Sequence, residues 1–218
     1  MTAFHHAHHT ADPAAIAVLN ATLMHVPFDG WSDAALAAGA ADAGVSYDRV
    51  AVLFPKGAID AIALHSRLAD AEMVAAFEAL PEAPQKTHLA IRALVLLRLE
   101  LAQANKDAVR RALSCLALPA HAKLSAELLY ATVDTMWRAA GQQDTGFSFY
   151  TRRATLAAVY SSTMLAWLAD NSGAMDKTVG FLDRRLANVA SIPKATGPLR
   201  GMQAVSYTHL TLPTIRSV

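Results

Sequence analysis

Few side chains in this 218-residue sequence have the type and spacing that catalysis or metal binding requires. The sequence has no Gly-rich phosphate loop, no Glu-x-x-His pair of a di-iron bundle and no local mark of a nucleophile. Histidines crowd the N-terminus at His5, His6, His8 and His9, with Asp12 as the one nearby carboxylate. They either bind a metal or form a disordered tail, and the shortage of carboxylates favours the tail. We therefore expect no catalytic residue, no metal site, no cofactor and no enzymatic activity.

Four large apolar side chains have spacings that allow them to share helix faces: Trp137, Tyr160, Met164 and Trp167. Such residues form either an ordinary core or the lining of a lipid cavity, and methionine suits a lipid because its thioether adapts to irregular shapes. The composition leaves material for a cavity, since 54% of residues are hydrophobic, 17% are charged and the mean hydropathy is +0.25. This apolar surplus must line a cavity, face a partner or face a membrane.

The charged residues and the single cysteine narrow the classes of partner. The net charge of +1 at pH 7 gives no preference for nucleic acid or for an anionic membrane. Cys115 alone excludes internal disulfides and a thiolate zinc site, and we expect it to be buried and inert. Arg152 and Arg153 open a predicted helix, where the helix dipole disfavours cations. They are either a solvated pair, or one of them reaches Asp144 or the acids of a partner.

The elements that must position these residues are helices, because apolar residues recur with a helical period and no sustained alternation occurs. Capping residues, prolines and glycines predict about nine helices, the first ending before Pro27. Their expected ranges are 13–25, 33–43, 47–54, 58–80, 85–103, 106–118, 121–140, 149–169 and 175–191. The predicted class is all-α, with a disordered His-rich tail over residues 1–12, a helix-turn-helix-like lobe over 13–57 and a helical ligand-binding lobe over 58–192.

The stretch 27–54 has the helix, tight turn and helix of a DNA-reading module. It carries four acids against the single base Arg49, the acids being Asp29, Asp33, Asp42 and Asp48. A DNA reader needs Lys and Arg to neutralise phosphates, so the charge favours a structural lobe. The connector GVS and the closing LFPKG nevertheless resemble TetR regulators. A TetR-type transcriptional regulator with an apolar ligand pocket therefore stays open as the alternative.

The tail over residues 205–218 differs from the Ala-rich helical sequence before it. VSYTHLTLPTI back-translates to a transposase adapter used in sequencing libraries, so we expect a non-native tail and a native sequence that is cut near Ala204. No secretory signal is visible, and no apolar run reaches the roughly 18–20 residues of a membrane span. We expect a soluble, cytoplasmic protein that is peripheral at the inner membrane.

Four segments together resemble one known family. They are HVPFDGWS over 25–32, LFPKGAIDAI over 53–62, MWRAAG with FSFYTRRATLAAVYSSTMLAWL within 136–168, and FLDRRL over 181–186. The chain is similar, over about residues 14–195, to the coenzyme Q biosynthesis accessory family, the ninth Coq protein. The resemblance implies a TetR-like fold without DNA binding. It also implies a non-catalytic protein that binds isoprenoid lipids or quinone precursors and presents them to the di-iron demethoxyubiquinone hydroxylase.

The family's functional surfaces carry over by position. The resemblance places the hydroxylase-docking patch on Met136, Trp137, Phe149 and Tyr150, with Phe149 where tryptophan is expected and Ala139 where a larger apolar residue is expected. It also implies a C-terminal amphipathic helix that touches the membrane. Analogy with the TetR fold adds a homodimer formed through the last two long helices. The apolar stripe of Phe181, Leu182, Leu186 and Val189, beside Arg184 and Arg185, either meets a membrane surface or packs on the domain.

Overall fold

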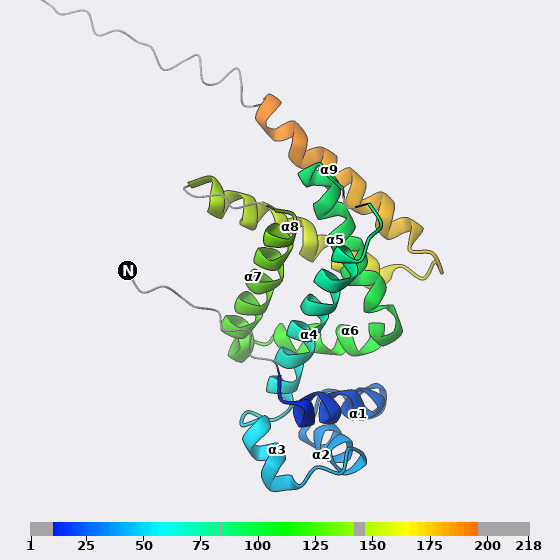
Figure 1. The fold of residues 1–218 in the computed structure, drawn as a ribbon, viewed down its shortest axis with the longest axis vertical. Coiled ribbons are helices and arrows are strands. Elements are labelled where there is room, and N and C mark those ends of the chain that lie inside the picture. Colours follow the sequence, from blue (N-terminus) through cyan, green and yellow to red (C-terminus); the bar gives the residue numbers. More distant parts are fainter. Residues whose placement is uncertain (1–10, 83, 142–146, 196–218) are drawn as a thin grey trace, which may run out of the picture.

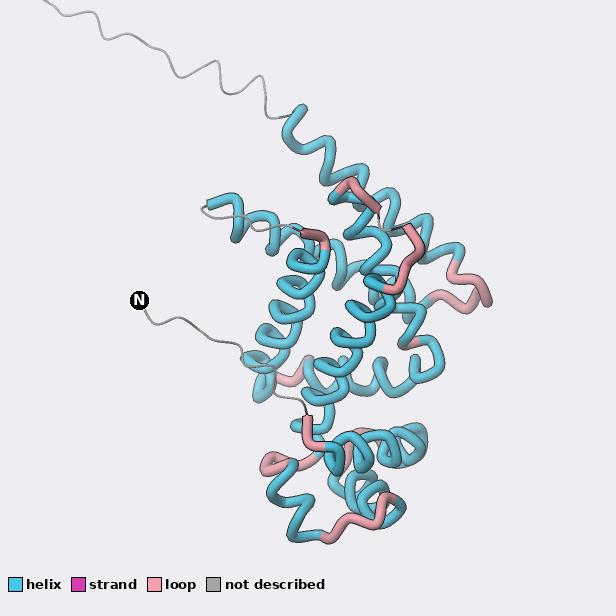
Figure 2. Tube along the Cα trace, in the orientation of Figure 1, coloured by secondary structure: helices cyan, strands magenta, loops and turns pink. Residues whose placement is uncertain are grey.

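The computed structural model describes residues 11–82, 84–141 and 147–195, and all regular structure in those ranges is helical (Figure 1, Figure 2). The predicted all-α class is thereby confirmed. The described α-helices are α1 (Pro13–Asp29), α2 (Asp33–Asp42), α3 (Tyr47–Leu53), α4 (Ala58–Glu78), α5 (Thr87–Leu101), α6 (Lys106–Leu116), α7 (Ala122–Ala139), α8 (Phe147–Ala169) and α9 (Asp176–Ala195), with short 3₁₀ turns η1 (Gln103–Asn105) and η2 (Pro119–His121). The predicted His-rich cluster and the predicted adapter tail lie outside the described residues.

The first helices begin where capping chemistry predicts. Asp12 accepts a hydrogen bond from the backbone of Ala14 at 2.9 Å, and Ser32 accepts one from Ala35 at 3.1 Å. The predicted end of the first helix is wrong, because α1 continues through Pro27 to Asp29. Pro27 lies in the last turn, where its missing N–H removes one backbone bond but leaves the turn intact. Gly30, with φ of 67°, ends the helix instead.

Helices α1–α3 form a small lobe at the bottom of Figure 1, and α4 leads from it into a larger bundle. Gly39 of α2 lies against Thr22 of α1, and a Cβ there would be 2.5 Å from the Thr22 backbone nitrogen. Trp31 donates from Nε1 to the carbonyl oxygen of Ala108 in α6 at 2.9 Å. The small lobe therefore shares a core with the start of α4 and with one face of α6.

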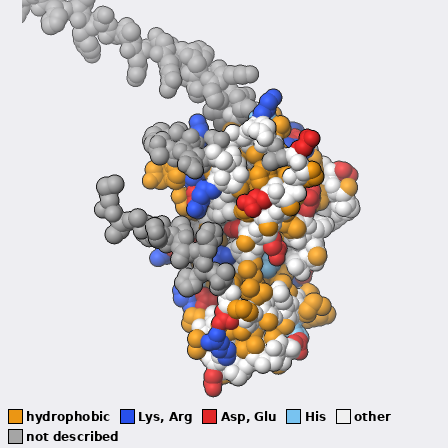
Figure 3. Space-filling model, viewed as in Figure 1, with side chains coloured by type: hydrophobic (Ala, Val, Ile, Leu, Met, Phe, Trp, Pro, Cys, Tyr) orange, Lys and Arg blue, Asp and Glu red, His pale blue; other side chains and the backbone are white. Residues whose placement is uncertain are grey.

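The acids of the small lobe take part in its own contacts. Asp33 accepts from the Ala58 backbone at 3.1 Å and so holds the first turn of α4. Asp42 pairs with His25 across 2.6 Å, and Arg49 of α3 pairs with Asp12. Hydrophobic side chains are exposed over the lower part of the face in Figure 3. Phe28 and Tyr47 are the most exposed large apolar side chains of the small lobe. Arg49, the base of the stretch 27–54 that could contact DNA phosphates, is thus paired with a carboxylate of this protein.

The larger bundle packs α4, α5, α7, α8 and α9 around one apolar core. Helix α9 lies against α5 and α8, and Asp183 of α9 pairs with Arg92 of α5 at 2.5 Å and 3.0 Å. Leu182 is fully buried, and Leu186 and Val189 pack against the core. The apolar stripe of α9 therefore packs on the domain along these residues, as one of the two predicted alternatives requires.

The turn between α8 and α9 is organised by the carboxylate of Asp170. It accepts hydrogen bonds from the backbone and side chain of Ser172 at 2.9 Å and 2.6 Å, and of Thr178 at 2.9 Å and 2.8 Å. The bonds from Ser172, followed by those from Thr178, hold the pKa of Asp170 well below its ordinary value. This carboxylate fixes the first turn of α9 and hence the angle at which α9 meets α8.

Candidate ligand cavity and partner surface

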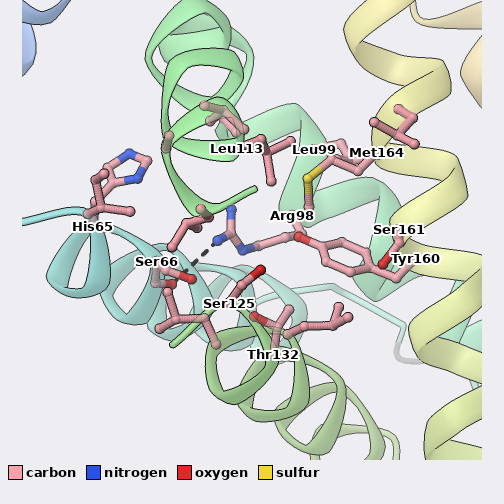
Figure 4. A pocket seen from close by; sticks show the side chains of 18 of the residues that line it. His65, Ser66, Arg98, Leu99, Leu113, Ser125, Thr132, Tyr160, Ser161 and Met164 are labelled. Carbon is pink, nitrogen blue, oxygen red and sulfur yellow. Dashed lines mark hydrogen bonds between the residues drawn. The ribbon is translucent and has the colours of Figure 1, made fainter. Parts of the chain in front are cut away.

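A cavity of about 230 Å³ lies in the larger bundle, lined by side chains of α4, α5, α6, α7 and α8 (Figure 4). Its walls are mostly apolar, with Leu99, Val109, Leu113, Leu128 and Met164 among them. Each helix contributes because its apolar face turns inward, and the faces leave a space between them instead of closing fully. The arrangement can hold a small apolar body, provided that its polar atoms meet matching groups.

Those matching groups come from a buried ion pair at the cavity wall. Arg98 of α5 donates from Nε to Asp70 of α4 at 3.0 Å, and their side chains are only 9% and 10% exposed. Thr132 of α7 donates to both carboxylate oxygens of Asp70, at 3.0 Å and 2.9 Å. Arg98 also donates from Nη2 to the carbonyl oxygen of Ser66 at 3.4 Å. This network ties three helices together and neutralises two charges that burial alone would make costly.

Burial and the ion pair set the protonation states around the cavity. Burial, assisted by Arg98, lowers the pKa of His65 to about 4, so its imidazole is neutral at physiological pH. Burial raises the pKa of Tyr160, so its hydroxyl keeps its proton. Burial opposes the charge on Arg98, but Tyr160 and Asp70 outweigh it and raise the pKa of the guanidinium. The cavity therefore presents one fixed cation and one phenol donor in an apolar wall.

Three of the four residues predicted to bind lipid line this cavity together. They are Tyr160, Met164 and Trp167 of α8. Trp167 is held in place because its Nε1 donates to Gln103 at 2.8 Å and the Lys106 ammonium lies 5.2 Å from its ring centroid. The shared helical face predicted from the sequence thus brings these three residues to one wall.

The fourth residue, Trp137 of α7, lies elsewhere. It lines a second cavity, of about 430 Å³, with Thr155, Leu156, Leu186 and other side chains of α5, α8 and α9. Its Nε1 is buried and has no hydrogen-bond partner among the described residues. Trp137 is therefore separated from the other three predicted lipid residues, because α7 turns its side chain toward α9 and away from α6.

The predicted partner patch divides into exposed and buried members. Tyr150 is 69% exposed, and its ring packs edge-on against Phe149 with centroids 5.1 Å apart. The Arg153 guanidinium lies 3.4 Å from the Phe149 ring centroid and so makes a cation–π contact that helps to hold this ring in place. Met136 is 0% exposed and lies in the core, so it has no surface to offer a partner. Met136 therefore cannot contact a partner directly and belongs to the core of the larger bundle.

Two expectations about single side chains need correction. Arg153 is not solvated: it is buried and donates to Asp134 of α7 at 2.9 Å, while the predicted partner Asp144 lies outside the described residues. Cys115 is half-buried, not buried, because the face of α6 that carries it covers only the edge of the core. Within the described ranges, His, Cys, Asp and Glu nowhere gather in a group of three that could hold a metal ion.

Comparison with known proteins finds one family to which most of the chain is similar. Residues 122–193 match the COQ9 family model. Over 206 residues the chain is 32% identical to the human protein named ubiquinone biosynthesis protein COQ9, mitochondrial, a match that covers 88% of this chain and 64% of that protein. The rat protein of the same name is also 32% identical over 206 residues, covering 88% and 66%. The chain is similar to the COQ9 family over most of its length. The resemblance predicted from the sequence is confirmed, and the chain spans slightly less than two thirds of the human relative's length.

Two more distant matches are a further relative named COQ9 and a solved structure that establishes the fold. The fission yeast relative, also named ubiquinone biosynthesis protein coq9, mitochondrial, is 27% identical, and the match covers 92% of this chain and 78% of that protein. The crystal structure of a TetR transcriptional regulator from Nitrosomonas europaea superposes with a TM-score of 0.63. It is 22% identical and covers 82% of this chain and 99% of the regulator, so the likeness concerns fold alone. The predicted TetR-like fold is confirmed.

The COQ9-matched segment spans α7, α8 and most of α9, and so contains every site residue predicted from the sequence. The buried pair Asp70 and Arg98 lies outside it, on α4 and α5, and sequence reasoning missed both residues. A signal was available for Arg98, which interrupts the apolar run LVLLRLEL at a position that faces the core. A charge on an apolar helix face is normally paired when buried. No helix in the described ranges is both long and apolar enough to cross a membrane.

Proposed function

We propose that this chain is a non-catalytic accessory protein of ubiquinone biosynthesis that binds isoprenoid quinone intermediates and presents them to the demethoxyubiquinone hydroxylase. The observation that carries the proposal is the apolar cavity walled by Tyr160, Met164 and Trp167, inside the COQ9-matched segment. Apolar cavities with few polar groups are typical of sites for small hydrophobic ligands. The names of the human and rat relatives supply the pathway.

The small lobe supports the separation of this function from DNA reading. Its helix α3 carries Asp48 in the first turn, and Arg49 of the same helix pairs with Asp12. Phosphate contacts require free Lys and Arg side chains, and the net charge of +1 adds no long-range attraction. The alternative, a TetR-type regulator, would show a defined operator and a steep salt dependence in a mobility-shift assay. We expect no sequence-specific shift even at low salt.

The proposed lipid binding is tested by identifying any lipid that co-purifies with the protein. Purified under non-denaturing conditions, the protein should release an isoprenoid quinone or a related lipid on organic extraction, detected by mass spectrometry. It should also bind a short-chain ubiquinone added in solution. A protein that purifies empty in repeated preparations and binds no quinone analogue would overturn the lipid-binding function.

The partner half rests on the aromatic pair of Phe149, which is half-buried, and Tyr150, which is exposed. An exposed aromatic anchored on a rigid helix has the character of a binding hot spot. We predict that Tyr150→Ala weakens hydroxylase binding by about 2 kcal/mol or more, roughly thirtyfold in Kd. Calorimetric titration with the purified hydroxylase measures the loss. Because the ring is 69% exposed, the free energy of unfolding should stay within about 0.5 kcal/mol of the wild-type value.

A matched control is Tyr130→Ala on α7, where the tyrosine is also exposed, at 49%. This variant should bind the hydroxylase as the wild type does. Equal losses in both variants would show a non-specific effect, and an unchanged Kd for Tyr150→Ala would remove the patch from the proposal. As part of the same function we propose a homodimer that is peripheral at a membrane, which size-exclusion chromatography with light scattering and liposome flotation test separately.

A further inference from the structure

The 230 Å³ cavity is too small for a long isoprenoid chain. A dry cavity of about 150 Å³ holds benzene, so a cavity of this size has room for one six-membered ring with a few substituents. By the same ratio it holds roughly nine non-hydrogen atoms, fewer than two isoprene units contain. A ligand that carries both a ring and a tail must therefore place one of them in this cavity and leave the other outside it.

Hydrogen-bond donors of two buried residues, Arg98 and Tyr160, favour one end of such a ligand over the other. Arg98 uses Nε for Asp70 and Nη2 for Ser66, while its Nη1 has no hydrogen-bond partner among the described residues. The Tyr160 hydroxyl also makes no hydrogen bond to any described residue, although Tyr160 is only 2% exposed. Figure 4 shows the Tyr160 ring reaching from α8 toward Arg98 across the space between the helices. Neither atom is fully enclosed: within the described ranges the enclosed side-chain polar atom that lacks a partner is Trp137 Nε1, so Arg98 Nη1 and the Tyr160 hydroxyl each keep some accessible surface. An occupant that displaces water from such donors is favoured when it brings an acceptor of its own.

We propose that this cavity takes the ring end of its ligand, and that Arg98 and Tyr160 donate hydrogen bonds to an oxygen acceptor on that ring. The inference rests on the proposed function and adds the orientation of the ligand and the two residues that set it. An isoprenoid tail has no acceptor for these donors, so a tail in the cavity would leave both unsatisfied. A carbonyl or phenol oxygen satisfies them, and the apolar walls of Leu99 and Met164 cover the faces of the ring.

The protonation states agree with this assignment. Tyr160 keeps its proton because burial raises its pKa, so its hydroxyl is available as a donor. His65 is neutral at physiological pH and adds no second cation beside Arg98. Asp70 already balances the charge of Arg98, so the site suits a neutral acceptor oxygen better than an additional anion.

The test uses two probes with the same number of non-hydrogen atoms, acetophenone and isopropylbenzene, of which only acetophenone carries an acceptor oxygen, where isopropylbenzene has a methyl group. Their dissociation constants are measured by calorimetry for the wild type, for Tyr160→Phe and for the surface control Tyr130→Phe. Tyr160→Phe removes only a hydroxyl that has no partner in the described chain, so the fold should persist, and thermal melts verify this. We expect Tyr160→Phe to weaken acetophenone binding about three- to tenfold and to change isopropylbenzene binding by less than about twofold.

Arg98→Lys keeps a cation for Asp70 but removes the planar fork, and it should weaken acetophenone binding by a similar factor. Acetophenone binding that is unaffected by both substitutions, or equal losses for the two probes, would overturn the inference. A short-chain ubiquinone separates this failure from failure of the proposed function. If the short-chain ubiquinone binds the wild type and Tyr160→Phe with equal affinity, only the ring-inward orientation is overturned. Absence of binding by the wild type would overturn the lipid-binding function as well.

Discussion

The buried imidazole of His65 predicts how the stability of this protein depends on pH. His65 lies on α4 between the two lobes, with its ring centroid 5.8 Å from that of Trp31, and it lines the cavity near Arg98. Burial, with a smaller contribution from Arg98, lowers its pKa from 6.5 to about 4. In the unfolded chain the same imidazole titrates at its ordinary pKa. The perturbation is therefore acidification, compared between the wild type and His65→Gln.

The sign and size follow from proton linkage. Between pH 6.5 and 4 the unfolded state binds more protons at His65 than the folded state does, so the free energy of unfolding falls as the pH falls. The whole shift corresponds to a loss of about 3 kcal/mol, of which about 2 kcal/mol falls between pH 7 and 5. Asp170 and Asp183 have lowered pKa values, so their stabilisation is present above their unfolded pKa of 3.8 and is lost only in stronger acid. The window from pH 7 to 5 thus isolates His65 from these carboxylates.

The assay is urea unfolding followed by far-UV circular dichroism at pH 7, 6 and 5. The wild type should lose about 2 kcal/mol across this range, and His65→Gln should lose little, whatever its starting stability. His88→Gln is the matched control, because His88 lies exposed on α5, and it should follow the wild type. The reasoning is refuted if His65→Gln loses as much stability as the wild type, or if the His65 ring titrates near 6.5 by NMR.

Two further pairs of substitutions test the interior. Arg98→Met should lower the free energy of unfolding by about 3–5 kcal/mol because it leaves Asp70 buried and unpaired, whereas Arg92→Met, in an exposed pair, should cost about 1 kcal/mol or less by urea unfolding. Gly39→Ala should cost roughly 1–3 kcal/mol by thermal melting, because its Cβ would lie 2.5 Å from a backbone nitrogen of α1. Gly173→Ala meets nothing within 4 Å and should be near neutral, so equal losses within either pair would contradict these contacts.

Local chemistry made most of the fold predictable. Caps at Asp12 and Ser32 and the turn at Gly44 act within one or two helical turns, so the sequence alone locates those boundaries. Pro27 misled the prediction because a proline near a helix end can either stop the helix or occupy its last turn. The choice depends on Gly30 beyond it and on burial of Val26, which is a tertiary contact that no local rule contains.

The site was less predictable because it depends on which helix faces meet. Tyr160, Met164 and Trp167 share one face of α8, and helical spacing was enough to group them. Trp137 lies apart from them, since its position on α7 directs it to the second cavity, and its role in lipid binding stays a prediction. Met136 was assigned to the surface beside it, yet adjacent residues on a helix point about 100° apart, and its side chain turns into the core.

The ion pair of Arg98 and Asp70 was out of reach for a different reason. The two residues are 28 positions apart, and only the packing of α4 against α5 brings them together. A buried pair of this kind adds little net stability, since apolar residues of similar volume often do as well or better. Leaving one of its members unpaired is nevertheless expensive, so the pair resists change in single steps. Binding of a ligand that requires a fixed donor in an apolar wall would explain why the ion pair is present, whereas its small contribution to stability does not. Ring recognition by Arg98 and Tyr160 therefore accounts for the charge pair and the small cavity together, whereas a cavity for tails alone would account only for the apolar walls.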